Sequence, residues 1–106
     1  MKIELIIDGK EKLFTTDMIP MLAKRKYMKL QANAEEKIKN NEYTTQTQLD
    51  EEDELVGILA NVIFKGQFTP DQVYEGASDD YVYSKVQEAI FGKQEETEQE
   101  EVEEGN

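Results

Sequence analysis

Five consecutive carboxylates, Asp50 to Glu54, form the longest unbroken run of titratable side chains in the sequence. A calcium loop of the EF-hand type needs oxygen ligands at alternate positions and a glycine at its sixth position, and this run provides neither. Acidic side chains in the first turn of a helix are stabilised by the helix dipole, so we interpret the run as a helix start. The sequence therefore predicts no metal site.

Other reactive groups are scarce. The chain has no histidine and no cysteine, which excludes an imidazole base, a thiolate nucleophile and disulfides. Ser78 and Ser84 lie outside any Gly-x-Ser-x-Gly setting, and no phosphate-binding loop or dinucleotide fingerprint is present. Exposed carboxylates with ordinary pKa values stay ionised at neutral pH and make poor general acids. We predict that the protein is not an enzyme and uses no cofactor.

The basic residues gather in one cluster, Lys24, Arg25, Lys26 and Lys29. The simpler interpretation is the solvent-exposed face of a helix, and the alternative is a binding site for an acidic segment, for example the tail of a neighbouring copy. Lysine and arginine number 12 against 24 acidic residues, and the net charge of −12 opposes binding to nucleic acid and to anionic membranes. The longest apolar stretch, near residues 55–64, is too short to cross a bilayer. We predict neither nucleic acid nor membrane as a partner.

Most aromatic side chains lie in the second half of the chain, where they can build the core or anchor an interface. Tyr81 and Tyr83 flank Val82, so at helical spacing one of them is exposed. We expect most of the aromatics to belong to the core. Together with the basic cluster they form the candidate partner-binding set: Lys24, Arg25, Lys26, Lys29, Phe64, Phe68, Tyr74, Tyr81, Tyr83 and Phe91.

The composition divides the chain at about residue 92. Residues 93–106 hold seven glutamates, one lysine and one clear hydrophobic residue, Val102. Such a segment buries too little apolar surface to offset the entropy of ordering its backbone. We predict a folded domain over residues 1–92 followed by a disordered acidic tail over residues 93–106.

A β-hairpin is predicted over residues 2–16. Ile3, Leu5 and Ile7 alternate with other residues, and Asp8-Gly9 follows as a turn signal. A four-residue connection from Asp8 to Glu11 places Phe14 opposite Leu5, whereas a two-residue turn places Lys12 there. We favour the longer connection. Pairing within one subunit and pairing between two subunits are both open.

Four helices are predicted at about 18–40, 50–65, 70–76 and 78–91. A polar loop over 42–48 separates the first two. The expected caps are Thr16 or Asp17 for the first helix, Thr69 with Gln72 for the third and Ser78 for the fourth. Gly66 suits the end of the second helix. The first helix carries an apolar stripe of Ile19, Ala23, Tyr27, Leu30, Ala34 and Ile38. The fold class is α+β, a mainly helical single domain with an N-terminal β-hairpin.

The segment from Phe64 to Gly76 (FKGQFTPDQVYEG), the hairpin over 3–10 (IELIIDGK) and the acidic end resemble the tail assembly chaperones of long-tailed, siphovirus-type phages and prophages of Gram-positive bacteria. The resemblance implies a non-catalytic protein that binds the tape measure protein, keeps it soluble and recruits subunits of the major tail tube protein. It also implies self-association, action in the cytoplasm of the bacterial host and absence from the mature virion. The family offers no catalytic residues to carry over.

Two other functions remain as alternatives. An acidic nucleic-acid mimic of the anti-restriction type needs carboxylates spaced regularly over a folded surface, and here they concentrate in the tail and in one helix start. The other alternative is a small cytoplasmic adaptor or regulator.

Overall fold

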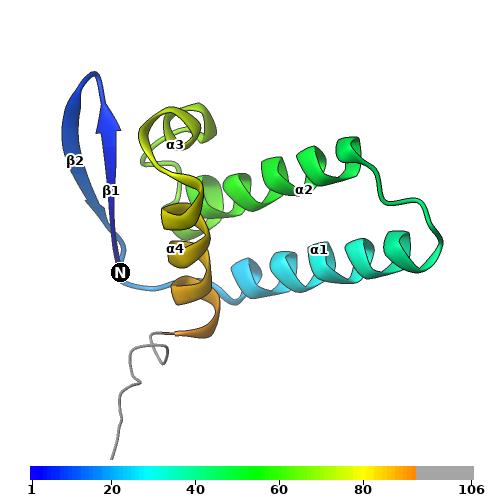
Figure 1. Cartoon of the computed structure of the whole chain (residues 1–106). Coiled ribbons are helices and arrows are strands. Elements are labelled where there is room, and N and C mark those ends of the chain that lie inside the picture. Colours follow the sequence, from blue (N-terminus) through cyan, green and yellow to red (C-terminus); the bar gives the residue numbers. More distant parts are fainter. Residues whose placement is uncertain (93–106) are drawn as a thin grey trace, which may run out of the picture.

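The computed structural model describes residues 1–92, and the predicted acidic tail over 93–106 lies outside the described residues. A β-hairpin is followed by four α-helices, which confirms the predicted α+β class (Figure 1). The elements are β1 (Lys2–Ile7), β2 (Lys10–Thr15), α1 (Met21–Lys39), α2 (Thr45–Gly57), the π-helix η1 (Ile58–Ile63), α3 (Pro70–Gly76) and α4 (Asp79–Phe91).

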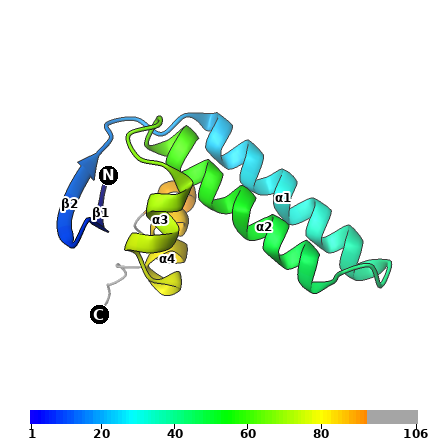
Figure 2. The same cartoon turned by 90° about the horizontal axis from the view of Figure 1, so that it is seen from above.

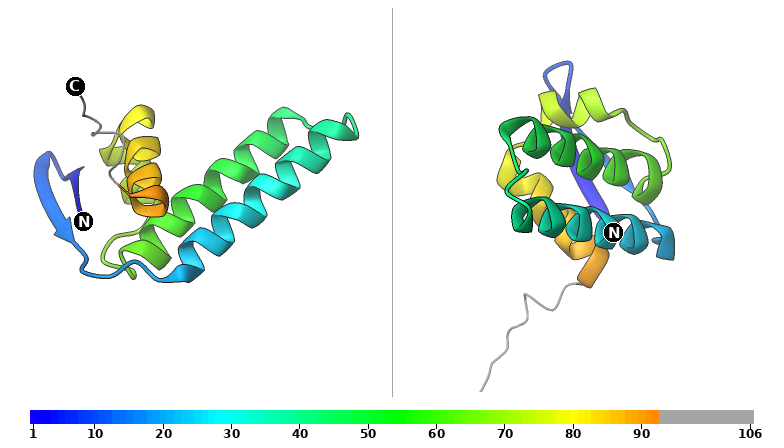
Figure 3. Two further views of the ribbon diagram at one scale, coloured as in Figure 1. Left: turned by 90° about the horizontal axis from the view of Figure 1, so that it is seen from below. Right: turned by 90° about the vertical axis from the view of Figure 1, so that its right-hand side faces the viewer.

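Helices α1 and α2 run antiparallel as a two-helix arm that projects away from the hairpin (Figure 2). Helices α3 and α4 lie between the hairpin and the root of this arm (Figure 3). The core sits at that junction, because α3 packs on β1 and η1 packs on α1. Its largest fully buried side chains are Ile3, Leu5, Leu59, Ile63, Phe64, Val73 and Val86.

The hairpin turn is shorter than predicted. Only Asp8 and Gly9 connect the strands, with φ of 54° and 79°, and the resulting register pairs Leu5 with Lys12. The four-residue connection was therefore the wrong prediction. Two residues in the left-handed region match the right-handed twist of the flanking strands, and this advantage outweighs the placement of Lys12 on the inner face. Phe14 still shares the face of Leu5 and packs against the core.

The start of α1 also differs from the prediction. Pro20 holds the N-cap position with no side-chain hydrogen bond, so neither Thr16 nor Asp17 caps the helix. Thr16 is buried and closes the hairpin instead: its backbone N–H donates to the carbonyl of Met1 at 3.0 Å. Its hydroxyl accepts a hydrogen bond from Lys65 Nζ at 3.0 Å. The Thr16 hydroxyl is therefore hydrogen-bonded to Lys65 and does not cap α1.

Helix α2 begins five residues earlier than the predicted helix, within the segment that was predicted to be a loop. Thr44 and Thr47 form a reciprocal capping box, in which each side-chain oxygen accepts from the backbone N–H of the other at 3.2 and 3.3 Å. This pair starts a helix in a threonine- and glutamine-rich segment. The run Asp50 to Glu54 consequently lies in the middle of α2, so the interpretation as a first turn was wrong.

The second predicted helix changes geometry before it ends. Its last part is the π-helix η1, in which the N–H of Phe64 donates to the carbonyl of Leu59 at 3.0 Å. Ile58, Leu59 and Ala60 are all buried in this widened segment. Gly66 follows with φ of 81°, which agrees with its predicted role at the helix end.

The predicted caps of the last two helices are confirmed. Thr69 and Gln72 form a capping box at α3, with hydrogen bonds of 2.9 and 3.2 Å. Ser78 accepts from the N–H of Tyr81 at 3.3 Å at the start of α4. Between these caps, Gly76 at the end of α3 lies directly against the backbone of Ile6 in β1, which brings the short helix onto the strand.

Candidate partner-binding surfaces

An apolar groove lies between the first half of α1 and the end of α4. Its volume is about 880 Å³, and apolar side chains supply most of its lining: Met21, Leu22, Met28, Ala32, Ala89 and Ile90. Met21 is 90% exposed and Met28 is 51% exposed, so their thioethers are accessible to a partner. We call this surface the methionine groove. None of these apolar residues was among the predicted site residues.

Helix geometry explains why the groove forms on this side of α1. Met21 and Met28 are seven residues apart, which is two turns of an α-helix, so both lie on one face. That face differs from the predicted apolar stripe. Of the stripe, only Ala23 is fully buried, and Ile38 is 59% exposed, so the stripe is not buried along its whole length. The spacing of the methionines is the sequence signal that could have revealed the groove.

The predicted basic cluster is divided between two surfaces, and all four side chains are exposed. Lys24, Arg25 and Lys29 line the methionine groove, and no acidic side chain of residues 1–92 lines it. Lys26 and Lys29 line a second cleft that faces α2. Lys24 Nζ also lies 5.9 Å from the ring centre of Phe91, within the range of a cation–π contact.

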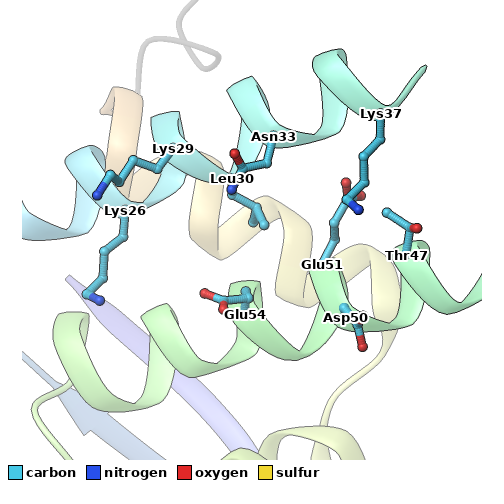
Figure 4. A pocket seen from close by; sticks show the side chains of 9 residues that line it. All are labelled: Lys26, Lys29, Leu30, Asn33, Lys37, Thr47, Asp50, Glu51 and Glu54. Carbon is cyan, nitrogen blue, oxygen red and sulfur yellow. The ribbon is translucent and has the colours of Figure 1, made fainter. Parts of the chain in front are cut away.

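The second cleft separates two rows of opposite charge on the arm (Figure 4). It has a volume of about 330 Å³. Lys26 and Lys37 extend into it from α1, and Glu51 extends toward Lys37 from α2 (Figure 4). Within residues 1–92, the only ion pair closer than 4.0 Å joins Lys85 and Glu88, in α4. The two rows therefore face one another across an open cleft without close ion pairs, and exposed charges at such separations contribute little stability.

Two of the predicted aromatic candidates belong to the core. Phe64 is 0% exposed and Phe68 is 3% exposed. Phe68 packs against Phe14 and Phe64, with ring centres 4.9 and 5.3 Å apart. This packing leaves neither ring on the accessible surface. The expectation that most of the aromatics belong to the core was wrong, because Tyr74, Tyr83 and Phe91 are exposed.

Tyr81 and Phe91 join elements together. The backbone N–H of Glu4 in β1 donates to the hydroxyl of Tyr81 at 2.9 Å, so Tyr81 covers the outer edge of the hairpin. Phe91 meets Tyr27 edge to face at 5.8 Å and thereby docks the end of α4 on α1. Phe91 remains 43% exposed beside the methionine groove. Gln87 strengthens the same junction by donating to the hydroxyl of Tyr27 at 3.0 Å.

Tyr74 and Tyr83 lie at a small cleft of about 230 Å³ between α2, α3 and α4. Tyr74 donates to Asp53 Oδ1 at 2.5 Å, and its pKa is raised first by burial and then by this hydrogen bond. Burial also raises the pKa of Tyr83, with a further contribution from Asp79. Tyr83 is 46% exposed while Tyr81 is half-buried, as the spacing of the two tyrosines predicted.

Within residues 1–92, no three acidic side chains converge to form a metal site, the Asp50–Glu54 run included. No helix in the same part of the chain is both long and apolar enough to span a membrane. The protein is therefore a small α+β domain with a projecting helical arm, and it exposes apolar side chains in an open groove.

The family assignment is more specific. A family model described as phage tail chaperone protein matches residues 1–106, and the chain belongs to that family. No curated protein and no solved structure matches it. The match confirms the resemblance to phage tail assembly chaperones, whereas the Gram-positive host stays a prediction. Membership assigns the chain to tail assembly in the host cell, in interaction with phage tail proteins, and favours this role over the mimic and the adaptor.

Proposed function

We propose that this chaperone binds the tape measure protein, keeps it soluble and recruits subunits of the major tail tube protein, acting through binding alone. The methionine groove is the observation that carries the proposal. Residues 1–92 contain 11 basic and 17 acidic residues, a net charge of −6 (11 − 17), and they form an accessible apolar groove of about 880 Å³. An aggregation-prone helical client needs this combination, because its apolar face must be covered by a carrier that itself resists aggregation.

The exposed apolar side chains of α1 support the same function. Leu22 and Met28 are about half exposed on α1, and exposed apolar patches of this kind mark interaction sites on small proteins. Methionine side chains adapt to irregular apolar partners, which suits a carrier that must cover a long and variable client. We further propose that copies of the chain self-associate and that the protein leaves before the virion is complete.

Co-expression tests the proposal. The chain is produced together with the tape measure protein of its own gene neighbourhood, and the soluble fraction of the tape measure protein is compared with production alone. The proposal expects a several-fold higher soluble fraction and co-purification of both chains. An insoluble tape measure protein, together with tight binding of the chain to a restriction enzyme, would instead establish the nucleic-acid mimic.

A further inference from the structure

We propose that the methionine groove accepts an amphipathic helix whose apolar stripe is flanked by carboxylates, and that the client segment held by this chaperone has that chemistry. The inference rests on the proposed function, since it describes the client that the groove would hold. Two properties of the groove carry it: the sign of the charge along its sides, and the exposure of the apolar residues between them.

The charge of the groove is opposite to that of the molecule. Residues 1–92 contain 17 acidic and 11 basic residues, yet the groove is lined by Lys24, Arg25 and Lys29 and by no acidic side chain. None of the three forms an ion pair closer than 4.0 Å with another of the described residues. Carboxylates on a partner would therefore meet cations that have no competing ion pair with residues 1–92, and electrostatic complementarity of this kind selects the partner and its orientation.

The apolar side chains of the groove set the shape of the occupant. Met21 and Met28 stand two turns apart on α1, and Ala89 and Ile90 of α4 line the same groove. An amphipathic helix presents apolar residues at intervals of three and four along one face, and polar residues flank that face on both sides. Such a helix places its stripe on the methionines and its flanking carboxylates beside the cations.

Other occupants fit less well. Residues 93–106 of the same chain contain seven glutamates but only one clear hydrophobic residue, Val102, so they match the cations and not the apolar lining. A symmetric contact between the grooves of two copies would oppose Lys24, Arg25 and Lys29 with copies of themselves, which costs free energy through like-charge repulsion.

The test uses the full chain and two synthetic 18-residue peptides that share one leucine stripe. One peptide carries glutamates beside the stripe and the other carries lysines, and fluorescence anisotropy measures the binding of each at about 0.15 M salt. We expect the glutamate peptide to bind at least 10-fold more tightly, although the net charge of −12 favours the lysine peptide. Equal binding, or tighter binding of the lysine peptide, would overturn the proposal.

Two triple variants locate the effect. Lys24→Glu, Arg25→Glu and Lys29→Glu together reverse the groove, and we expect them to reverse the peptide preference. Lys2→Glu, Lys10→Glu and Lys12→Glu make the same change of charge on exposed positions of the hairpin, and we expect the preference to persist. An equal loss in both variants would show that overall charge acts instead of the groove. Circular dichroism verifies that each variant is folded.

The same variants separate this inference from the proposed function. If the wild-type chain and the groove variant solubilise the tape measure protein equally well, the inference about the groove is wrong and the chaperone function is retained. A wild-type chain that fails to solubilise it removes the proposed function, whatever the peptides show. A groove variant whose mass in sedimentation falls to that of a monomer, with unchanged peptide binding, would assign the groove to self-association and overturn the proposal.

Discussion

Replacing Gly76 with alanine should destabilise the junction between α3 and β1. A Cβ added at Gly76 would lie 3.0 Å from the nitrogen of Ile6 and 3.1 Å from its carbonyl carbon, and closer still to its carbonyl oxygen. Cβ contacts below 3.4 Å are tighter than nine in ten of those in real proteins. All three atoms belong to the backbone of a paired strand, so the helix or the strand must move.

The expected cost follows from two opposing effects. Overpacking a well-packed site costs about 1–3 kcal/mol. An alanine gains about 0.4–1 kcal/mol over glycine where the backbone accepts it, because the unfolded chain loses freedom. The net loss for Gly76→Ala is therefore roughly 1–2 kcal/mol. For a domain of this size, that loss lowers the Tm by roughly 4–16 °C.

Gly57→Ala is the matched control. Gly57 has a helical φ of −61°, and a Cβ added there meets nothing within 4 Å. This variant should gain about 0.4–1 kcal/mol and melt at a higher temperature. Thermal unfolding by circular dichroism measures both. A Tm of Gly76→Ala at or above that of the wild type would refute the close approach of α3 to β1.

Three further predictions address the caps, the tyrosines and the acidic end. Thr44→Ala removes the capping box with Thr47 and should cost about 1 kcal/mol in urea unfolding; an unchanged midpoint would contradict the observed start of α2. The raised pKa of Tyr74 means that stability present below pH 10 is lost as pH rises above 10, because the unfolded chain loses this proton first. Tyr74→Phe removes the hydrogen bond to Asp53 and should flatten part of that loss between pH 10 and 12; an identical pH profile would argue against the contact. Deletion of residues 93–106 should leave the Tm nearly unchanged, since we expect residues 1–92 to fold without them, and a fall of many degrees would disprove that boundary.

Local signals in the sequence predicted much of the fold. Thr69 with Pro70 and Gln72 specifies a helix start within four residues, so the beginning of α3 was predicted correctly. Gly66 likewise marks a helix end through a φ of 81°. Thr44 and Thr47 form a capping box through two threonine hydroxyls, and the polar composition around them favoured a loop instead. The start of α2 was missed for this reason.

The surfaces were harder to predict because they depend on packing between distant segments. Lys24, Arg25 and Lys29 were selected as a basic cluster, but their relation to Ala89 and Ile90 arises only when α4 folds back on α1. The apolar stripe of the first helix was predicted from its spacing alone. In the structure α2 covers it incompletely, and Met21 on another face becomes the most exposed of the large apolar residues within 1–92.

We infer that the client lies in the methionine groove. The most direct measurement is the soluble yield of the tape measure protein co-expressed with the wild type, with Met28→Asp, and with Leu13→Asp as a control. Leu13 is 56% exposed on the hairpin, close to the 51% of Met28 on the groove. We expect Met28→Asp to lower the soluble yield several-fold and Leu13→Asp to leave it unchanged. A full yield with Met28→Asp, or an equal loss with Leu13→Asp, would contradict it.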